Sequence, residues 1–457
     1  MKKYYLLAIS IFIPLLSFGQ ENNLELLYQW TDDGTVLNAE PDPGDNWVGN
    51  IYNEIWGFVQ NGHEFAVIGS TQGTHIFDVT DPVNSYLVAS INGASTSPSV
   101  VHRDFHTYNG YLYAVADEMN SSTLQIIDIS ELPNSTSVVY DTNDMITRSH
   151  NIFIDEENGI MYSCGGKING ESNYLSIISL ADPEAPVFLT DYETHGYVHD
   201  IYVKNGIGYL NAGGNGLHIV DFSDYNNPQT LGSLTDYPYK GYNHSGWLTE
   251  DGNTYVFADE NHGYKMKICD VSNPNEITVL TTLLSDIDEQ SMAHNLIIKD
   301  NLLYVSHYHD GLWIWDISDP VNPSYVASYD TYAPAGHESY RGAWGVYPLL
   351  PSGNILVSDM QYGLFVFAPP NEAVSKIHEP KNAVTLFPNP CKNILHIKTE
   401  SNTMKEYKVY DIYGNLVLLK KSMTKHEKLD ISTLSAGIYI INIDNFNTIY
   451  QHRIVKY

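Results

Sequence analysis

The sequence has little positive charge, few cysteines and no long apolar segment beyond its N-terminus. It contains 23 Lys and Arg against 54 Asp and Glu, a formal net charge of −31. This balance argues against nucleic acid or an anionic membrane as a partner, because both attract basic surfaces. The three cysteines, Cys164, Cys269 and Cys391, cannot form an even disulfide framework. After residue 19 no segment is long and apolar enough to cross a bilayer.

The first 19 residues have the organisation of a secretory signal peptide. Lys2 and Lys3 form a charged start, residues 4–16 are apolar, and Ser17 and Gly19 fit a small-residue cleavage site. The apolar run is shorter than a membrane span requires. The sequence therefore predicts a signal peptide over 1–19, and a mature chain that leaves the cytoplasm without a transmembrane segment.

Aromatic residues are abundant where charge is scarce. Aromatics make up 12% of the chain, with 35 Tyr, while charged residues make up 17%, a profile that favours an extracellular β-rich protein over a disordered or coiled-coil one. The acidic excess lies within residues 20–380, and residues 381–457 carry more basic than acidic side chains. Such a change in charge indicates two separate modules.

A repeat of 45 to 50 residues runs through the larger module. An apolar phrase recurs seven times, as THIFD, LQIID, LSIIS, LHIVD, MKICD, LWIWD and LFVFA. A second marker precedes each phrase, with its key residue 22 to 29 residues before the last residue of the phrase. The key residues of these markers are Trp56, His102, His150, His199, His244, His294 and Trp344. A period of this length is typical of solenoids and propellers.

Each unit divides into four short strands. In the fourth unit, residues 199–203, 208–212, 217–221 and 230–234 are the expected strands, with a hairpin turn at Asn205-Gly206. Four-stranded units at this period match propeller blades. The last unit ends after its third strand, and residues 24–31 resemble the missing fourth one. We therefore expect an all-β fold: a seven-bladed β-propeller closed by an N-terminal strand, which hides both sheet edges.

These seven units resemble the LVIVD repeat of the choice-of-anchor B family of secreted bacterial propellers. The resemblance covers residues 24–369 and implies a propeller domain over 20–369. It implies an architecture and an extracellular location, and it does not imply a biochemical activity.

The C-terminal segment has its own strand pattern. After a polar linker over 370–381, residues 382–457 alternate apolar and polar side chains between turns, as in a small β-sandwich. This segment resembles the C-terminal sorting domain of the type IX secretion system. The residues that carry the resemblance are Phe387, Pro388, Asn389, Pro390, Gly414 and Gly437. The resemblance implies the type IX secretion machinery as a partner, export across both membranes, and a cell-surface or extracellular location.

The blade-opening histidines are the strongest candidate site. In an antiparallel propeller blade the first strand starts at the face where the second strand ends, so the markers and the loops after the second strands share one face. The candidate ligands are His102, His150, His199, His244 and His294. The candidate second ligands or supporting groups are Asp117, Glu118, Asp259, Glu260, His307, His309 and Asp359. Imidazoles and carboxylates around one axis suit a transition metal, with Zn, Cu, Mn or Fe as candidates.

A structural role competes with the metal site. A histidine at each strand start can hydrogen bond a backbone carbonyl or a polar side chain of the next blade and so join neighbouring blades. The leading hypothesis for the protein is a secreted or cell-surface binding module for an extracellular protein, glycan or small ligand. The alternative is a metalloenzyme, an oxidoreductase, lyase or hydrolase, with its metal held by the hub histidines. The sequence leaves the catalytic residues, and the choice between these hypotheses, open.

Overall fold

The computed structural model describes residues 24–32, 49–118, 121–285, 287–334, 336–337, 339–370, 384–388, 391–399, 405–411, 416–444 and 449–456. The predicted signal peptide and most of the predicted linker lie outside these residues. By its internal contacts the chain divides into two compact units, residues 1–371 and 372–457. No helix among the described residues has the length and apolarity that a membrane span requires.

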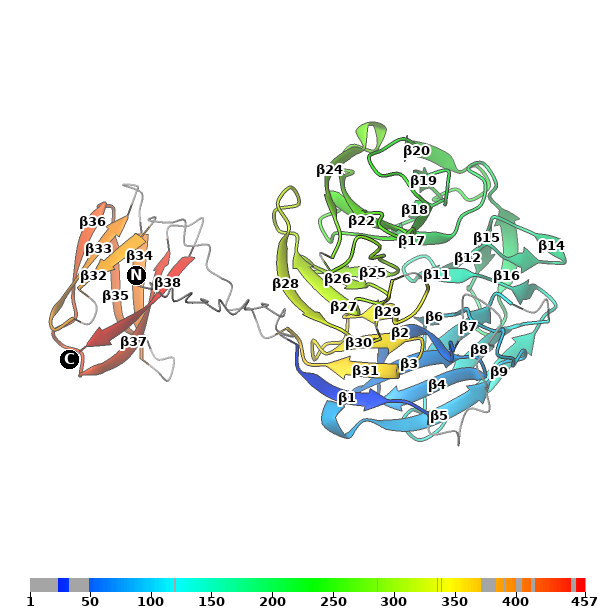
Figure 1. Cartoon of the computed structure of the whole chain (residues 1–457), viewed down its shortest axis with the longest axis horizontal. Helices are drawn as coiled ribbons and strands as arrows, with labels where there is room; N and C mark the ends of the chain where they lie inside the picture. The colour runs from blue at the N-terminus through cyan, green and yellow to red at the C-terminus, as the bar shows by residue number, and fades with distance from the viewer. Residues whose placement is uncertain are drawn as a thin grey trace, which may run out of the picture. The chain divides into compact units, whose positions relative to one another are not determined.

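Within the described residues, the first unit contains seven four-stranded antiparallel sheets arranged in a ring (Figure 1). In six of them, each a simple meander, the four strands pair in the order in which they occur along the chain. Their strands are β2 (Tyr52–Gln60), β3 (His63–Ser70), β4 (Gly73–Asp78) and β5 (Tyr86–Asn92); β6 (Arg103–Tyr108), β7 (Tyr111–Ala116), β8 (Leu124–Asp128) and β9 (Ser137–Thr142); β11 (Asn151–Asp155), β12 (Ile160–Cys164), β15 (Leu175–Ser179) and β16 (Val187–Asp191); β17 (Asp200–Lys204), β18 (Ile207–Asn211), β19 (Leu217–Asp221) and β20 (Gln229–Leu234); β21 (Asn243–Leu248), β22 (Thr254–Asp259), β23 (Met266–Asp270) and β24 (Thr278–Leu283); β25 (Leu296–Lys299), β26 (Leu302–Ser306), β27 (Leu312–Asp316) and β28 (Ser324–Tyr329).

The seventh sheet joins the two ends of the unit. It consists of β29 (Ala343–Tyr347), β30 (Ile355–Asp359), β31 (Gly363–Phe367) and β1 (Leu26–Trp30). Strand β1 pairs antiparallel with β31, from Leu26 opposite Phe367 to Trp30 opposite Leu364. The predicted closure by an N-terminal strand is therefore confirmed. The pairing removes the free edge that β31 would otherwise present.

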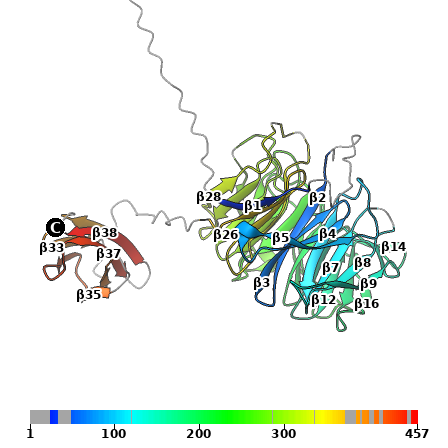
Figure 2. The ribbon, with the colours of Figure 1, turned by 90° about the horizontal axis from the view of Figure 1, so that it is seen from below.

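The first strand of each sheet lies next to the central axis. Each of these strands contacts the next one around the ring, and β29 contacts β2, so the circle is closed. Seen from the side, the sheet of β4 and β5 lies beside that of β7 and β8 (Figure 2). Apolar side chains fill the space between neighbouring sheets; Val256 and Ile268, for example, pack in one cluster with Leu303 of the next sheet. The predicted all-β propeller is confirmed.

The recurring apolar phrase is the third strand of its sheet. In β19 the four residues before Asp221 are buried because both faces of the strand pack against neighbours. The closing Asp then starts a turn, since its carboxylate accepts a hydrogen bond from the backbone N–H two residues on. The backbone N–H of Ser223 donates to Asp221 at 2.8 Å, and that of Ser272 donates to Asp270 at 2.9 Å. The repeated Asp thus has a structural reason that is independent of any binding site.

The remaining elements of the first unit are short. Asn205 and Gly206 form the predicted turn, with φ of 54° and 76°, as a two-residue hairpin requires. A small three-stranded sheet of β10 (Ile146–Arg148), β13 (Lys167–Ile168) and β14 (Glu171–Ser172) projects from the third unit of the repeat. Two 3₁₀ turns, η1 (Pro82–Asn84) and η2 (Pro274–Glu276), precede β5 and β24.

The second unit has two facing antiparallel sheets. One contains β32 (Val384–Phe387), β33 (Ile394–Thr399) and β36 (His426–Asp430). The other contains β35 (Leu416–Ser422), β34 (Lys405–Tyr410), β37 (Gly437–Asp444) and β38 (Ile449–Lys456). Leu395 and Ile397 of the first sheet share one core with Tyr407, Ile441 and Ile454 of the second. This arrangement is the β-sandwich that the alternating sequence predicts.

Candidate functional site

The inner strands bring three layers of side chains to the central axis. Side chains two residues apart lie on the same face of a strand, so in β6 and just before it His102, Asp104 and His106 follow one another along the axis. In β17 the order is His199, Asp200 and Tyr202; here His199, immediately before the strand, is adjacent in sequence to Asp200, and Tyr202 follows two residues later. We name the successive levels the imidazole layer, the carboxyl layer and the aromatic layer.

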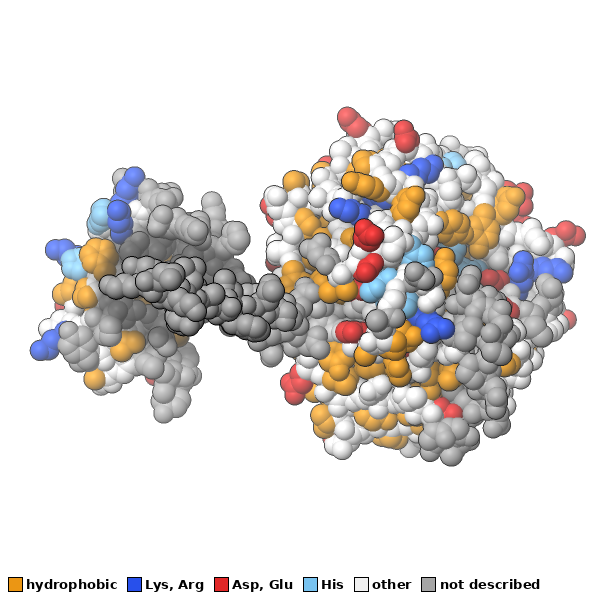
Figure 3. Space-filling view, in the orientation of Figure 1, with side chains coloured by type: hydrophobic (Ala, Val, Ile, Leu, Met, Phe, Trp, Pro, Cys, Tyr) orange, Lys and Arg blue, Asp and Glu red, His pale blue; other side chains and the backbone are white. Residues whose placement is uncertain are grey.

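The imidazole layer is a closed circle of rings. It consists of His102, His150, His199, His244, His294 and Trp344. The ring centroids of successive members are 5.0, 4.2, 4.1, 4.4 and 4.3 Å apart, and Trp344 returns to His102 at 5.2 Å. Figure 3 shows histidine side chains gathered near the centre of this face of the unit. The five sequence-predicted histidines are therefore neighbours of one another.

Four of the five imidazoles are held through Nδ1. His199 donates to the carbonyl of His244 at 3.2 Å, and His294 donates to the carbonyl of Trp344 at 2.5 Å. These are the predicted contacts between neighbouring blades. His150 donates to Asp117 at 2.9 Å, and His102 to Glu118. A proton on Nδ1 leaves the Nε2 lone pair available, and this is how most metal-bound histidines are held in place.

His199, His244 and Glu260 converge most closely. One potential ligand atom from each lies within 4.8 Å of the other two. Glu260 follows β22, and its Oε2 is 3.6 Å from Nε2 of His244. The Tyr308 hydroxyl donates to the other carboxylate oxygen at 2.5 Å and so fixes the carboxylate. His244 is buried, and its Nδ1 has no hydrogen-bond partner.

Burial keeps the two imidazoles of this trio neutral. It lowers the pKa of His199 and of His244 well below the usual value, and the neighbouring histidines lower both further. Burial also raises the pKa of Glu260 to about 7, against the opposing effect of the Tyr308 hydrogen bond. Two neutral imidazoles and one carboxyl group form a donor set that suits a divalent transition metal. A cavity of about 20 Å³ lies between the imidazole rings and the side chains one level deeper, among them Glu54, Asp104 and Asp200, and Glu260 does not line it.

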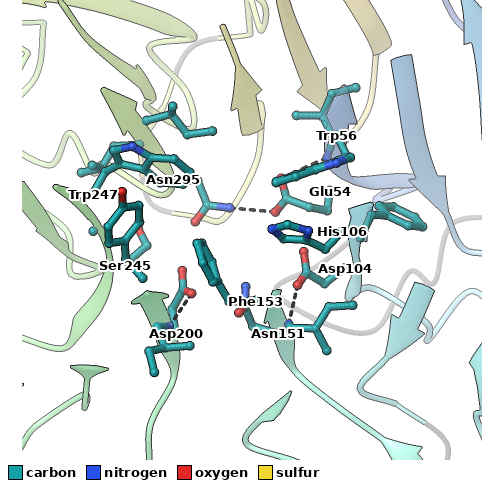
Figure 4. A pocket seen from close by; sticks show the side chains of 18 of the residues that line it. Glu54, Trp56, Asp104, His106, Asn151, Phe153, Asp200, Ser245, Trp247 and Asn295 are labelled. Carbon is teal, nitrogen blue, oxygen red and sulfur yellow. Dashed lines mark hydrogen bonds between the residues drawn. The ribbon is translucent and has the colours of Figure 1, made fainter. Parts of the chain in front are cut away.

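The carboxyl layer lies one step deeper along the axis. It consists of Glu54, Asp104, Asn151, Asp200, Ser245 and Asn295. Figure 4 shows the carboxyl groups of Glu54, Asp104 and Asp200 around one common space. Asn295 donates to Glu54 at 2.7 Å, and Asp104 accepts from the backbone N–H of Ile152 at 2.6 Å. Burial raises the pKa of Asp104 to about 7, and it raises those of Glu54 and Asp200 well above the usual carboxyl value.

The aromatic layer forms the other end of the axis. It consists of Trp56, His106, Phe153, Tyr202, Trp247 and Tyr347. The successive centroid distances from Trp56 to Trp247 are 4.4, 5.3, 5.4 and 4.7 Å, and Tyr347 lies 5.0 Å from Trp56. A cavity of about 70 Å³ lies between the carboxyl layer and these rings. The two ends of the hub thus differ in chemistry, with imidazoles at one end and mostly carbon rings at the other.

Four of the supporting residues predicted from the sequence lie away from the imidazole layer. Asp259 forms a buried ion pair with Lys267 at 2.5 Å. His307 lies 3.3 Å from Asp310, and His309 contacts the carbonyl of Ser339 at 2.8 Å. Asp359 accepts from Thr331 and from the turn that follows it. These contacts are local to their loops. The other three, Asp117, Glu118 and Glu260, contact hub histidines.

The sequence pattern missed Glu54 and misplaced Trp56. The prediction that Trp56 opens its unit at the level of the histidines was wrong, because its ring lies beside His106 and Tyr347 in the aromatic layer. Counting back along β2 from Trp56 to the level of Asp104 would have led to Glu54. Tyr308 was also missed, and no sequence signal distinguishes it from the many other tyrosines.

Within the second unit, Phe387 ends β32 and is exposed, while Gly437 begins β37. Pro388 follows β32 directly. Asn389, Pro390 and Gly414 lie outside the described residues.

Comparison with known proteins identifies both units. Residues 103–139, 195–236 and 291–331 match the LVIVD repeat, and residues 385–457 match the secretion system C-terminal sorting domain. No curated protein sequence matches the chain. The choice-of-anchor B assignment stays a prediction.

Three solved structures serve as examples of proteins with a similar fold. PorZ of Porphyromonas gingivalis, described as an essential bacterial surface component of the type IX secretion system, is 10% identical, with a TM-score of 0.46 over 92% of this chain and 60% of PorZ. The chain therefore spans about 60% of the length of PorZ. A Lactobacillus plantarum protein is 13% identical, with a TM-score of 0.47 over 83% of this chain and 100% of its own. The Cps50 (Swd1) β-propeller domain of Myceliophteria thermophila is 10% identical, with a TM-score of 0.49 over 75% and 98%.

The sorting domain implies export by type IX secretion to the cell surface or the extracellular space. The chain thus contains LVIVD repeats in a β-propeller and a secretion system C-terminal sorting domain.

Proposed function

We propose that the exported propeller is a binding module whose hub holds a divalent transition metal at the imidazole layer. His199, His244 and Glu260 are the proposed ligands. The observation that carries this proposal is their convergence within 4.8 Å of one another. Zinc, manganese, copper and iron(II) all accept imidazole and carboxylate ligands. Bound there, the ion would offer its open coordination positions to an extracellular ligand.

The hydrogen bonds of the layer support a metal in addition to a structural role. A contact between blades uses only one ring nitrogen, and His199 makes that contact through Nδ1. Its second nitrogen then has a lone pair in a buried site. His244 has an unpartnered nitrogen that is almost completely shielded from solvent. A buried polar atom without a partner is costly. A metal ion at this position would use the lone pair of His199, and it would satisfy Nδ1 of His244 where that nitrogen is the ligand.

The contacts of Glu260 favour a role as a metal ligand. Glu260 is already engaged by the Tyr308 hydroxyl. Its proposed role is accordingly that of an oriented ligand.

Metal analysis of the full chain, produced without a His tag, tests the proposal. After reconstitution with each metal and dialysis, we expect about one tightly bound ion per chain. A His199→Ala, His244→Ala double variant should lose that ion, and Glu260→Gln should bind it more weakly. His75→Ala is the matched control, because His75 is buried and both its nitrogens bond serine hydroxyls, at 2.8 and 2.9 Å. Failure of the wild-type chain to retain any of the four metals would refute the proposal.

A further inference from the structure

The cavity at the aromatic end of the hub has walls of two kinds. The rings of Trp56, Phe153, Tyr202 and Trp247 form one wall, and each of them retains some solvent-accessible surface. The carboxyl groups of Glu54, Asp104 and Asp200 form the other (Figure 4). Neither the imidazole layer nor its proposed metal uses this cavity. Its chemistry therefore requires a separate explanation.

With its carboxyl groups ionised, the state that a bound cation favours, the cavity contains an excess of hydrogen-bond acceptors. Its described lining residues include three carboxyl groups and no Lys or Arg. His106 contributes no cation, because burial lowers its pKa to about 4. The side-chain oxygens of Asn151 and Asn295 are buried and have no hydrogen-bond partner. Glu54, Asp104 and Asp200 each accept at least one hydrogen bond, but the two amide oxygens have no donor, and such buried oxygens are costly.

The aromatic rings of the cavity favour a ligand whose hydrogen-bond donor is positively charged. Aromatic faces attract cations through their quadrupole and pack against alkyl groups. Trp56 and Tyr202 each lie beside a carboxyl-layer residue of their own strand, Glu54 and Asp200. A ligand in this cavity can therefore place a positive charge at the carboxyl layer and carbon against the rings. A primary ammonium meets the polar requirement, since it has three N–H donors and no acceptor.

We propose that this cavity binds a primary alkylammonium group, with its nitrogen at the carboxyl layer and its alkyl chain leaving through the aromatic layer. The nitrogen donates to Glu54 and to the unpartnered oxygens of Asn151 and Asn295. The alkyl carbons pack against Trp56 and Trp247. The group belongs either to a free amine or to a lysine side chain of another protein. The proposed metal ligands His199, His244 and Glu260 do not line this cavity, so either proposal can fail alone.

Calorimetric titration of the full chain with n-butylammonium tests the proposal. We expect saturable binding of n-butylammonium and no binding of 1-butanol, which has the same carbon chain without the charge. Trp247→Leu should weaken binding about tenfold, and Glu54→Gln should weaken it more. Glu64→Gln is the charge-matched control, because Glu64 does not line the cavity. Its carboxylate accepts hydrogen bonds from the hydroxyl and the backbone N–H of Ser352 at 2.6 and 2.7 Å. This variant should bind like the wild type.

The ligand comparison keeps the proposal testable if a variant does not fold. Equal binding of 1-butanol, no detectable binding of n-butylammonium at about 10 mM, or tighter binding of K⁺ or Ca²⁺ than of the amine would each overturn it. Binding of Nα-acetyl-lysine amide more tightly than n-butylammonium would identify a lysine side chain as the source of the group. The reverse order would identify a free amine.

Discussion

The two ends of the hub are formed by the same strands and yet differ in chemistry. The imidazole layer comes from the residues at and just before the strand starts, where carboxylates of the neighbouring loops, Asp117 and Glu118, hold two of its rings. The aromatic layer comes from positions inside the strands, where side chains mainly pack. Loop–strand junctions allow ligand atoms to be oriented by side chains from elsewhere, whereas strand interiors favour rigid packing. Under the two proposals above, each end binds a different kind of cation.

Removing the closing strand should have the largest effect, because it affects both ends together. Deletion of residues 24–31 removes β1 and leaves the edge of β31 unpaired. We expect the truncated chain to lose the cooperative unfolding transition at the melting temperature of the wild type. It should also lose both metal and amine binding. Calorimetric melting and the two titrations measure this. If the truncated chain melts like the parent, β1 does not hold the ring closed.

The double variant His199→Ala, His244→Ala should separate the two ends. We expect metal affinity to fall at least about 100-fold, because two of three ligands are lost. Butylammonium affinity should stay within about twofold, since neither residue lines the aromatic cavity. Parallel titrations with both ligands provide the readout. A loss of amine binding of similar size would show that the hub is a single coupled site.

The propeller was predictable from the sequence because its causes are local and repeated. The buried apolar phrase and its closing Asp, as in β19 and Asp221, return at a fixed spacing, and each has its own physical reason. The hub was only partly predictable. A spacing locates His199 at a strand start, but it does not say which ring nitrogen is engaged. That depends on the carbonyl of His244, 45 residues away. Glu54 was missed because the first unit has no histidine at its marker.

Asp104 and His106 should respond to pH in opposite directions, although they lie two residues apart on β6. The folded-state pKa of Asp104 is raised to about 7, so its stabilising contribution is present at low pH and is lost as the pH rises toward 7. The folded-state pKa of His106 is lowered to about 4, so its contribution is present above about pH 6.5 and is lost as the pH falls toward 4.

Denaturant unfolding of Asp104→Asn and His106→Gln across pH 4 to 8 measures these contributions. Relative to the wild type, Asp104→Asn should gain about 1 kcal/mol per pH unit between pH 5 and 7. His106→Gln should make the stability curve flatter between pH 6.5 and 4. Parallel curves for both variants and the wild type would contradict the assigned burial of these groups.

A change outside the hub should have the smallest effect. Asp221→Ala removes the carboxylate that accepts from Ser223 at the end of β19. We expect a loss of about 1 kcal/mol in unfolding free energy and unchanged binding at both ends. Denaturant unfolding and the two titrations check this. Altered metal affinity in this variant would mean that the repeat phrase contributes to the site.

The most direct test of the metal proposal is anomalous X-ray scattering from crystals grown with zinc. The account predicts a single strong anomalous peak about 2.0–2.2 Å from ring nitrogens of His199 and His244 and from a carboxylate oxygen of Glu260. Absence of a peak at the imidazole layer, with zinc bound elsewhere or not at all, would contradict it.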